Sequence, residues 1–189
     1  GNTVRHVKCK NGTSYYADFV IAACDPHVVW ERLLQGKYMD SQFELRYNDP
    51  AYYPLASNIY VSIGCEGTMD QIPRTLKFPV ESVAIQENQK PIKHLQMTHY
   101  SYEPSFAPQG HTVITIAINQ FQPELDWWEA LAANKMAYAQ KKEEIGSEVL
   151  KAVETRFPSL KGKLKILDVA TPQTYTKYCN AYRGAFMGF

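Results

Sequence analysis

The chain contains few residues whose types and spacing could perform catalysis. Its serines lack the GxSxG turn that exposes a nucleophile, and no histidine stands at an informative spacing from a cysteine. Carboxylate pairs such as Glu143 and Glu144 have the pattern of a solvated surface rather than of glycosidase chemistry. No CxxC or His/Cys spacing fits a zinc site. We therefore assign no catalytic residue and expect no metal.

Two histidines are close in sequence, on a segment that reads as a strand. His94 and His99 are five residues apart, which places them on opposite faces and excludes joint metal binding within that strand. His99 shares its face with Leu95 and Met97, the usual setting of a hydrogen-bonded core histidine. We keep His99 as a candidate pocket residue.

The strand expected at His111 to Phe121 has two different faces. Three isoleucines at alternate positions make one apolar face, which should pack on helices. The other face has smaller, partly polar side chains: Val113, Thr115, Ala117 and Asn119. This second face either lines a tunnel for an apolar ligand, with His99 across from it, or packs on a second layer of helices.

The elements that would position these residues begin with a hairpin. Asn11-Gly12 separates Val4–Lys10 from Thr13–Ala23 and predicts a two-residue turn in which both central residues have positive φ. The apolar run 20–23 predicts a strand buried on both faces. Asp25 is then expected to cap a helix whose first residue is Pro26.

Later segments predict a mixed sheet and one long helical region. Alternation indicates strands at 55–66, 78–86, 92–102, 111–121 and 164–170. Helical periodicity runs from Pro123 to Phe157, with a four-residue stripe of apolar side chains, and a short helix follows Pro172. These elements predict an α+β fold with a mixed, largely antiparallel sheet and helices packed mainly on one face.

Composition narrows the classes of partner and compartment. The chain has 189 residues, enough for one domain or a domain with an appendage, and a formal net charge of +1 from 20 basic and 19 acidic residues. This balance argues against nucleic acid as a partner. The four cysteines read as free thiols, and neither a spanning apolar run nor a signal-like segment is present, so we expect a cytoplasmic location.

Four segments together resemble the phytoene desaturase and carotenoid isomerase family of FAD-dependent oxidoreductases, which are more distantly related to amine oxidases. NGTSYYADFVIAACDP is similar to that family's "DG…ADxVIxxxDP", and SFAPQGHTVITIAI to its "APPGKHxLxVxV". RFPSL is similar to its "YxPxL", and ATPQTYTKY with RGAFMGF to its "xTPxTxxxY…GGxxxG". The four matches follow the family's order.

The resemblance implies a substrate-binding domain inserted between two parts of an FAD-binding domain. Residues 1–25 would be a hairpin and strand of the FAD-binding domain, 26–170 the substrate-binding domain, and 171–189 the segment returning towards the flavin. The chain would cross between the domains at Asp25-Pro26 and again after Thr171-Pro172. The resemblance implies that Gly184 and Gly188 are the residues that contact the FAD cofactor.

The chain lacks the GxGxxG loop that holds a dinucleotide pyrophosphate at a helix N-terminus. We therefore expect it to be an internal part of a longer polypeptide, unable to bind FAD alone, whose partners are the FAD-binding part and an apolar small molecule such as a polyisoprenoid. Such a substrate is compatible with membrane association, although no basic amphipathic helix stands out. Two alternatives stay open: an amine-oxidase-like flavoenzyme with an aromatic pocket, and a non-catalytic lipid- or protein-binding domain.

Overall fold

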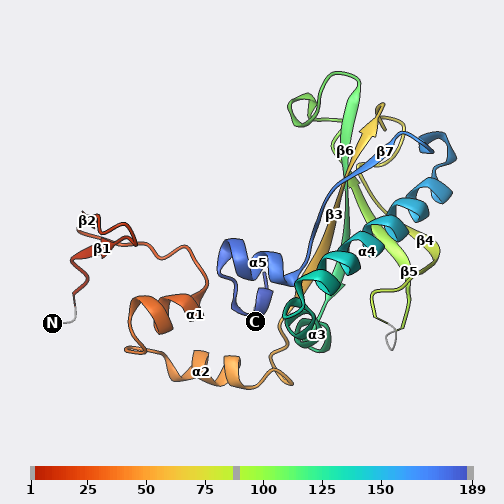
Figure 1. Ribbon diagram of the computed structural model, residues 1–189. Helices are drawn as coiled ribbons and strands as arrows, with labels where there is room; N and C mark the ends of the chain where they lie inside the picture. The colour runs from red at the N-terminus through yellow and green to blue at the C-terminus, as the bar shows by residue number, and fades with distance from the viewer. Residues whose placement is uncertain (1–2, 87–89, 187–189) are drawn as a thin grey trace.

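A computed structural model describes residues 3–86 and 90–186 and is built around a five-stranded sheet (Figure 1). Each strand pairs antiparallel with its neighbours in the order β4-β5-β6-β3-β7. The strands are β3 (Ser57–Glu66), β4 (Thr75–Val83), β5 (Ile92–His99), β6 (His111–Gln120) and β7 (Leu164–Ala170). All five predicted strands are present, and β7 has the predicted limits.

The alternation of β6 determines which face of the sheet is buried. Ile114, Ile116 and Ile118 are at most 4% exposed, and they pair with residues of β3 that are equally buried. Paired residues of antiparallel strands project to the same face, so these positions form one continuous apolar layer. The predicted apolar face of this strand is confirmed.

Two consecutive helices account for the predicted helical region. α3 (Gln122–Ala132) and α4 (Lys135–Arg156) are separated at Asn134, whose side chain accepts hydrogen bonds from the first amides of α4. The stripe Ile145, Val149 and Val153 is fully buried in the same cluster as the β3 and β6 side chains. Figure 1 shows α4 crossing the sheet on this side. The structure therefore has the predicted α+β fold.

Trp128 fixes α3 against the end of β6. Its indole is fully buried, and its Nε1 donates a hydrogen bond to Oε1 of Gln120 over 2.9 Å. Because Gln120 is itself 1% exposed, this bond satisfies a polar group that would otherwise be buried alone. Trp128 is therefore a core anchor of α3.

The remaining α-helices are short and lie at one end of the sheet, away from the 3-10 turn at Pro104–Phe106. An N-terminal arm carries α1 (Pro26–Val28), which continues into a π-helical turn at Val29–Leu33, and α2 (Ser41–Asn48). After β7 the chain forms α5 (Pro172–Cys179) and a single turn at Tyr182–Gly184. In Figure 1, α5 lies between α1 and the end of the sheet. The two predicted crossings therefore meet in this region.

The N-terminal hairpin is present, but its turn differs from the prediction. β1 (His6–Lys8) pairs with β2 (Ser14–Tyr16), and Gly12 has φ +88°, whereas Asn11 is not among the residues with positive φ. The Gly12 amide donates to the Cys9 carbonyl, and the Cys9 amide to that of Thr13. The loop is thus longer than two residues, with one left-handed glycine. The prediction of two positive φ values was wrong.

The prediction of a buried strand at residues 20–23 is also wrong. These residues form no strand, Val20 is 42% exposed and Ile21 is 90% exposed. A strand buried on both faces needs a neighbour on each side and cover above and below, and the described residues provide none of these for this run. The apolar pattern is therefore present without the partner that it requires.

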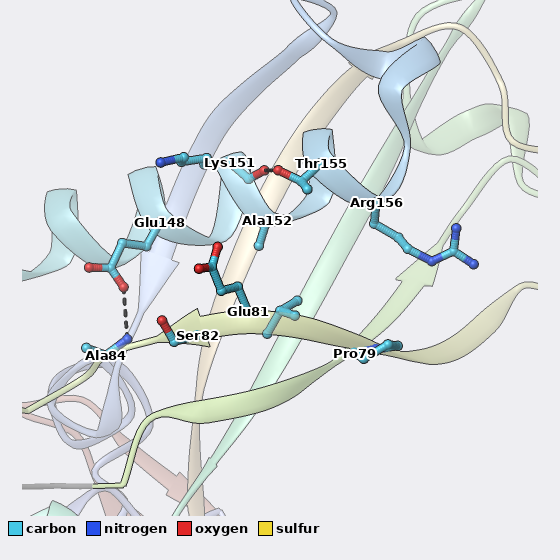
Figure 2. A pocket seen from close by; sticks show the side chains of 10 residues that line it. Pro79, Glu81, Ser82, Ala84, Glu148, Lys151, Ala152, Thr155 and Arg156 are labelled. Atoms are coloured by element: carbon cyan, nitrogen blue, oxygen red, sulfur yellow. Dashed lines mark hydrogen bonds between the residues drawn. The ribbon is translucent and has the colours of Figure 1, made fainter.

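Strand β4 forms an exposed edge of the sheet, and a side chain from α4 partly blocks it. Figure 2 shows Glu148 reaching from α4 to the end of β4, where its carboxylate accepts a 2.9 Å hydrogen bond from the Ala84 amide. Pro79, also in Figure 2, has no amide hydrogen to offer within the same strand. Both features remove donors that another strand could use, so we treat the groove in Figure 2 as a protected edge.

Candidate functional site

A single carboxylate holds together the two segments where the sequence predicts the crossings, near Asp25 and near Tyr182. Oδ1 of Asp25 accepts a hydrogen bond from the His27 amide and caps α1, while Oδ2 accepts one from the Tyr182 amide, both over 2.8 Å. The His27 ring stacks on Tyr182 with centroids 4.2 Å apart. Asp25 therefore starts a helix, as the Asp-Pro pattern predicts, and also ties the first crossing to the return segment.

A cavity of about 500 Å³ opens where the crossings meet. Its lining comes mainly from aromatic and small apolar side chains of α1, α2, α5 and the return segment, among them Phe43, Tyr47, Tyr175, Tyr182 and Phe186. Burial and the neighbouring Asp25 charge raise the pKa of Tyr47 to about 12. Burial raises the pKa of Tyr175 to about 12 as well. Both phenols are therefore neutral hydrogen-bonding groups at physiological pH.

Replacing Asp25 by Asn should loosen the return segment. The amide side chain has one acceptor oxygen instead of two, so either the His27 or the Tyr182 amide loses its bond and faces an NH₂ group. A hydrogen bond to a charged group contributes about 1.5–3 kcal/mol, so we expect the Tyr182 amide to exchange with solvent about 10- to 100-fold faster. Hydrogen exchange measured by NMR checks this.

Asp40→Asn is the matched control for that change. Asp40 caps α2 through the Gln42 amide, so its carboxylate serves the N-terminal arm rather than the return segment. Its replacement should leave exchange at Tyr182 unaltered. Equal effects of the two substitutions on the Tyr182 amide would show that Asp25 does not tie the crossings together.

Gly184, one of the two predicted cofactor-binding residues, has a structural requirement for glycine. Its φ is +76°, and a Cβ built there would lie 2.2 Å from the Pro172 carbonyl oxygen. Its carbonyl accepts a 2.6 Å hydrogen bond from the buried Ser57 hydroxyl. Gly184 thus packs the turn at Tyr182–Gly184 against the start of α5 and against β3. Gly188, the other predicted residue, lies outside the described residues.

Arg183 occupies a position where the resembled pattern has its first glycine. Its φ is +52°, in the left-handed region that glycine prefers. Its guanidinium forms an ion pair with Asp126 and lies 3.6 Å from Glu129, both on α3. These contacts fix the Arg183 side chain against α3.

The face of the sheet opposite α4 begins at this cavity. Tyr175 of α5 donates a 2.7 Å hydrogen bond to Asn58, which pairs with Asn119 on that face. From there the face continues along Ala117 and Thr115 to Val113. Val113, Thr115 and Ala117 are half-buried and Asn119 is exposed. We call this surface the open face, because no second helical layer covers these four positions among the described residues.

A second cavity, of about 370 Å³, lies at the far end of the open face. Val113, Phe106 and Leu167 line it, together with Gly64. A Cβ on Gly64 would lie 3.4 Å from Leu167 Cδ2, an ordinary contact distance, which shows that Leu167 lies directly over Gly64 of β3. Asn119 and Val113 are six residues apart on β6, so the two ends of the face are separated by about 20 Å.

The structure separates His99 from the four other predicted substrate-lining residues. His99 pairs with Ile114, so its side chain is on the buried, helix-covered face, and it is 4% exposed. Its Nε2 lies 2.9 Å from the Ile72 carbonyl oxygen. His99 is therefore a hydrogen-bonded core histidine and is not across from Val113, Thr115, Ala117 and Asn119.

Several residues of the two cavities were missed by sequence reasoning. Tyr47, Tyr182, Phe106 and Leu167 come from loops, short helices and an edge strand with no distinctive motif. The concentration of tyrosine in the chain was the one available signal, and it did not indicate which tyrosines gather. Among the described residues no group of acidic, histidine and cysteine side chains could hold a metal ion. No helix in the described ranges is both long and apolar enough to cross a bilayer.

Comparison with known proteins gives one distant relationship. Prolycopene isomerase 1 and prolycopene isomerase 2, both chloroplastic proteins of an Oncidium hybrid cultivar, are each 29% identical to this chain over 85 residues. The match covers 44% of this chain and 14% of each relative. No protein-family profile matches the chain. The chain is thus distantly related to carotenoid isomerases and corresponds to a small part of their length.

Proposed function

We propose that this chain is the substrate-binding portion of an FAD-dependent desaturase, isomerase or saturase acting on a polyisoprenoid or another apolar molecule. The observation that carries the proposal is the open face, whose two ends lie at the aromatic cavity and at the second cavity, about 20 Å apart. An elongated hydrocarbon matches that length, and the small side chains of Val113, Thr115 and Ala117 leave room for it. The distant relationship to prolycopene isomerases supports the same substrate class.

The cavity at the crossings suits the flavin ring better than the rest of the cofactor. Its aromatic and apolar lining can pack against a planar ring, with neutral Tyr47 and Tyr175 as hydrogen-bonding groups. Gly184 does not line this cavity, and its carbonyl accepts the Ser57 bond, so its role is to hold the neighbouring lining residues Tyr182 and Ala185 in place. When bound, the flavin would supply the redox chemistry, while these residues position substrate and exclude water.

The direct test uses the complete polypeptide that contains this chain. We expect the purified, flavin-loaded protein to convert an acyclic polyene such as prolycopene, presented in detergent micelles, with products separated by chromatography. Binding of the polyene without conversion would favour a lipid-binding domain. If the protein neither bound nor converted any polyene, the proposal would be contradicted.

The chain alone is expected not to retain FAD. A dinucleotide needs a preformed phosphate site for useful affinity, and this sequence has no glycine-rich loop of that kind. After mixing with FAD and dialysis, the protein should be colourless and show no flavin absorbance at about 450 nm. A stoichiometric yellow chromophore would contradict this expectation and place the whole cofactor site within the chain.

The cavity at the crossings also favours a second candidate function. Five of its lining residues are aromatic, and an aromatic pocket is what an amine-oxidase-like enzyme would use to hold an amine. The complete protein should be assayed with a panel of primary and secondary amines alongside polyenes. Turnover of amines and not of polyenes would favour this alternative.

A further inference from the structure

We propose that a cavity on the other side of α5 binds the phosphate groups of a small phosphorylated molecule. The cavity measures about 660 Å³ and lies between α5, the start of α4 and the end of β7. Its lining includes Lys135, Lys142 and Lys177, with Tyr138 and Tyr178. Two helices far apart in sequence thus contribute three lysines to the lining of one hollow.

The charge in this cavity is poorly balanced by the protein itself. Asp168 is the one acidic residue among the described residues of the lining, and its carboxylate lies 3.9 Å from Lys142 Nζ. Among the residues that the structure describes, no carboxylate lies within ion-pair distance of Lys135 or Lys177. The three lysines thus outnumber the one carboxylate of the lining, and a bound polyanion supplies the missing counter-charge.

The other lining groups also suit an anion with an organic part. Gln173 and Thr174 of α5 add polar side chains beside the lysines. The Lys177 ammonium lies 4.9 Å from the centre of the Tyr178 ring, and Lys142 lies 5.9 Å from that of Tyr138. Flat rings beside ammonium groups provide a surface on which the organic part of the ligand can pack.

The chemistry favours phosphate over a single carboxylate. An ammonium group is a compact charge that binds phosphate oxygens without a fixed fork geometry, and three of them match the several negative charges of a diphosphate. The cavity falls in the size range of small-molecule sites, about 300–1,000 Å³. Diphosphate groups occur on soluble metabolites, and phosphate monoesters on lipid headgroups, so the two sources share this chemistry.

This site is separate from the cavity proposed to meet the flavin and does not depend on that proposal. Tyr175 and Cys179 of α5 line the cavity at the crossings. The cavity that contains Lys135, Lys142 and Lys177 is lined by other residues of the same helix: Gln173, Thr174, Lys177 and Tyr178. The two sites therefore lie on different sides of α5. At the base of this helix, Tyr138 OH lies 2.6 Å from Thr171 Oγ1, so a ligand that orders Tyr138 also orders the start of α5.

The test titrates inorganic pyrophosphate into the chain by calorimetry at constant ionic strength, with chloride as the compensating anion. We expect saturable one-to-one binding. Replacing both Lys135 and Lys177 by Gln should weaken it about 10-fold or more, since each charge-assisted contact contributes strongly to phosphate recognition. Lys37→Gln with Lys161→Gln removes the same charge from exposed positions outside the cavity and should change the affinity by less than about 2-fold.

Two outcomes would overturn the proposal. Equal weakening by the two double variants would show a general charge effect, and the absence of saturable binding by the unmodified chain would show that the lysines are only solvated. Flotation with vesicles containing phosphatidic acid, compared with pure phosphatidylcholine, identifies the source. Retention that depends on Lys135 and Lys177 would indicate a lipid headgroup, and pyrophosphate binding without retention a soluble metabolite. Both support a phosphate site in this cavity.

Discussion

Gly184→Ala should lower the free energy of unfolding of the return segment by about 3 kcal/mol or more. The left-handed backbone alone disfavours a residue with a Cβ by about 1–2 kcal/mol. In addition, the new Cβ would lie 2.2 Å from the Pro172 carbonyl oxygen, a distance that real structures do not tolerate. Since the obstacle is backbone rather than a flexible side chain, Pro172 and Gly184 must move apart. The Ser57 bond to Gly184 would be lost with them.

The measurement is amide exchange along the return segment, together with denaturant unfolding. The Phe186 amide donates to the Ala56 carbonyl over 3.1 Å and reports whether the segment remains docked. Gly162→Ala is a matched control, because Gly162 has the same φ of +76° but no neighbouring atom within 4 Å of the position that a Cβ would take. That variant should lose only the backbone contribution of about 1–2 kcal/mol. Equal losses in the two variants would mean that packing against Pro172 is unimportant.

Ala117→Trp in the complete, flavin-loaded enzyme should reduce kcat/KM for an apolar substrate by about 100-fold, equivalent to about 2.7 kcal/mol. Ala117 lies in the middle of the open face, paired with Tyr60 of β3 and Gln96 of β5. A tryptophan there would fill the space along which the proposed substrate runs between the two cavities. The sheet core should be preserved, because this side chain projects away from α4.

Glu143→Trp serves as the control for that substitution, since Glu143 is exposed on α4. It places the same bulky group on a helix surface and should leave turnover within about 2-fold of the unmodified enzyme. Steady-state kinetics with circular dichroism on both variants gives the comparison. Normal folding with unchanged turnover in Ala117→Trp would remove the open face from the substrate path.

Local periodicity was sufficient to predict the sheet and its main helices. The alternating isoleucines of β6 and the four-residue stripe of α4 each predict which face of the element is buried. The side chains on both predicted faces are buried in the structure. These patterns repeat every two or nearly four residues, so the information lies within one short segment. The α+β class follows from the order of such segments.

Predictions failed where the structure of a segment depends on contacts with residues distant in the sequence. Residues 20–23 have the composition of a buried strand, but the described chain gives them no pairing strand and no cover. His99 was grouped with Val113 because both looked able to line a pocket. The register that pairs His99 with Ile114 places it on the opposite face.

The sequence by itself determined the strands of the main sheet, its long helical region and the faces that these elements bury. Tertiary structure alone decided that Asp25 bonds the amide of Tyr182, 157 residues later, that Leu167 lies over Gly64, and that Lys135 and Lys177 share a cavity. The reason is physical. Secondary structure depends on neighbours within a few residues, whereas a site depends on which distant elements the packed core brings side by side.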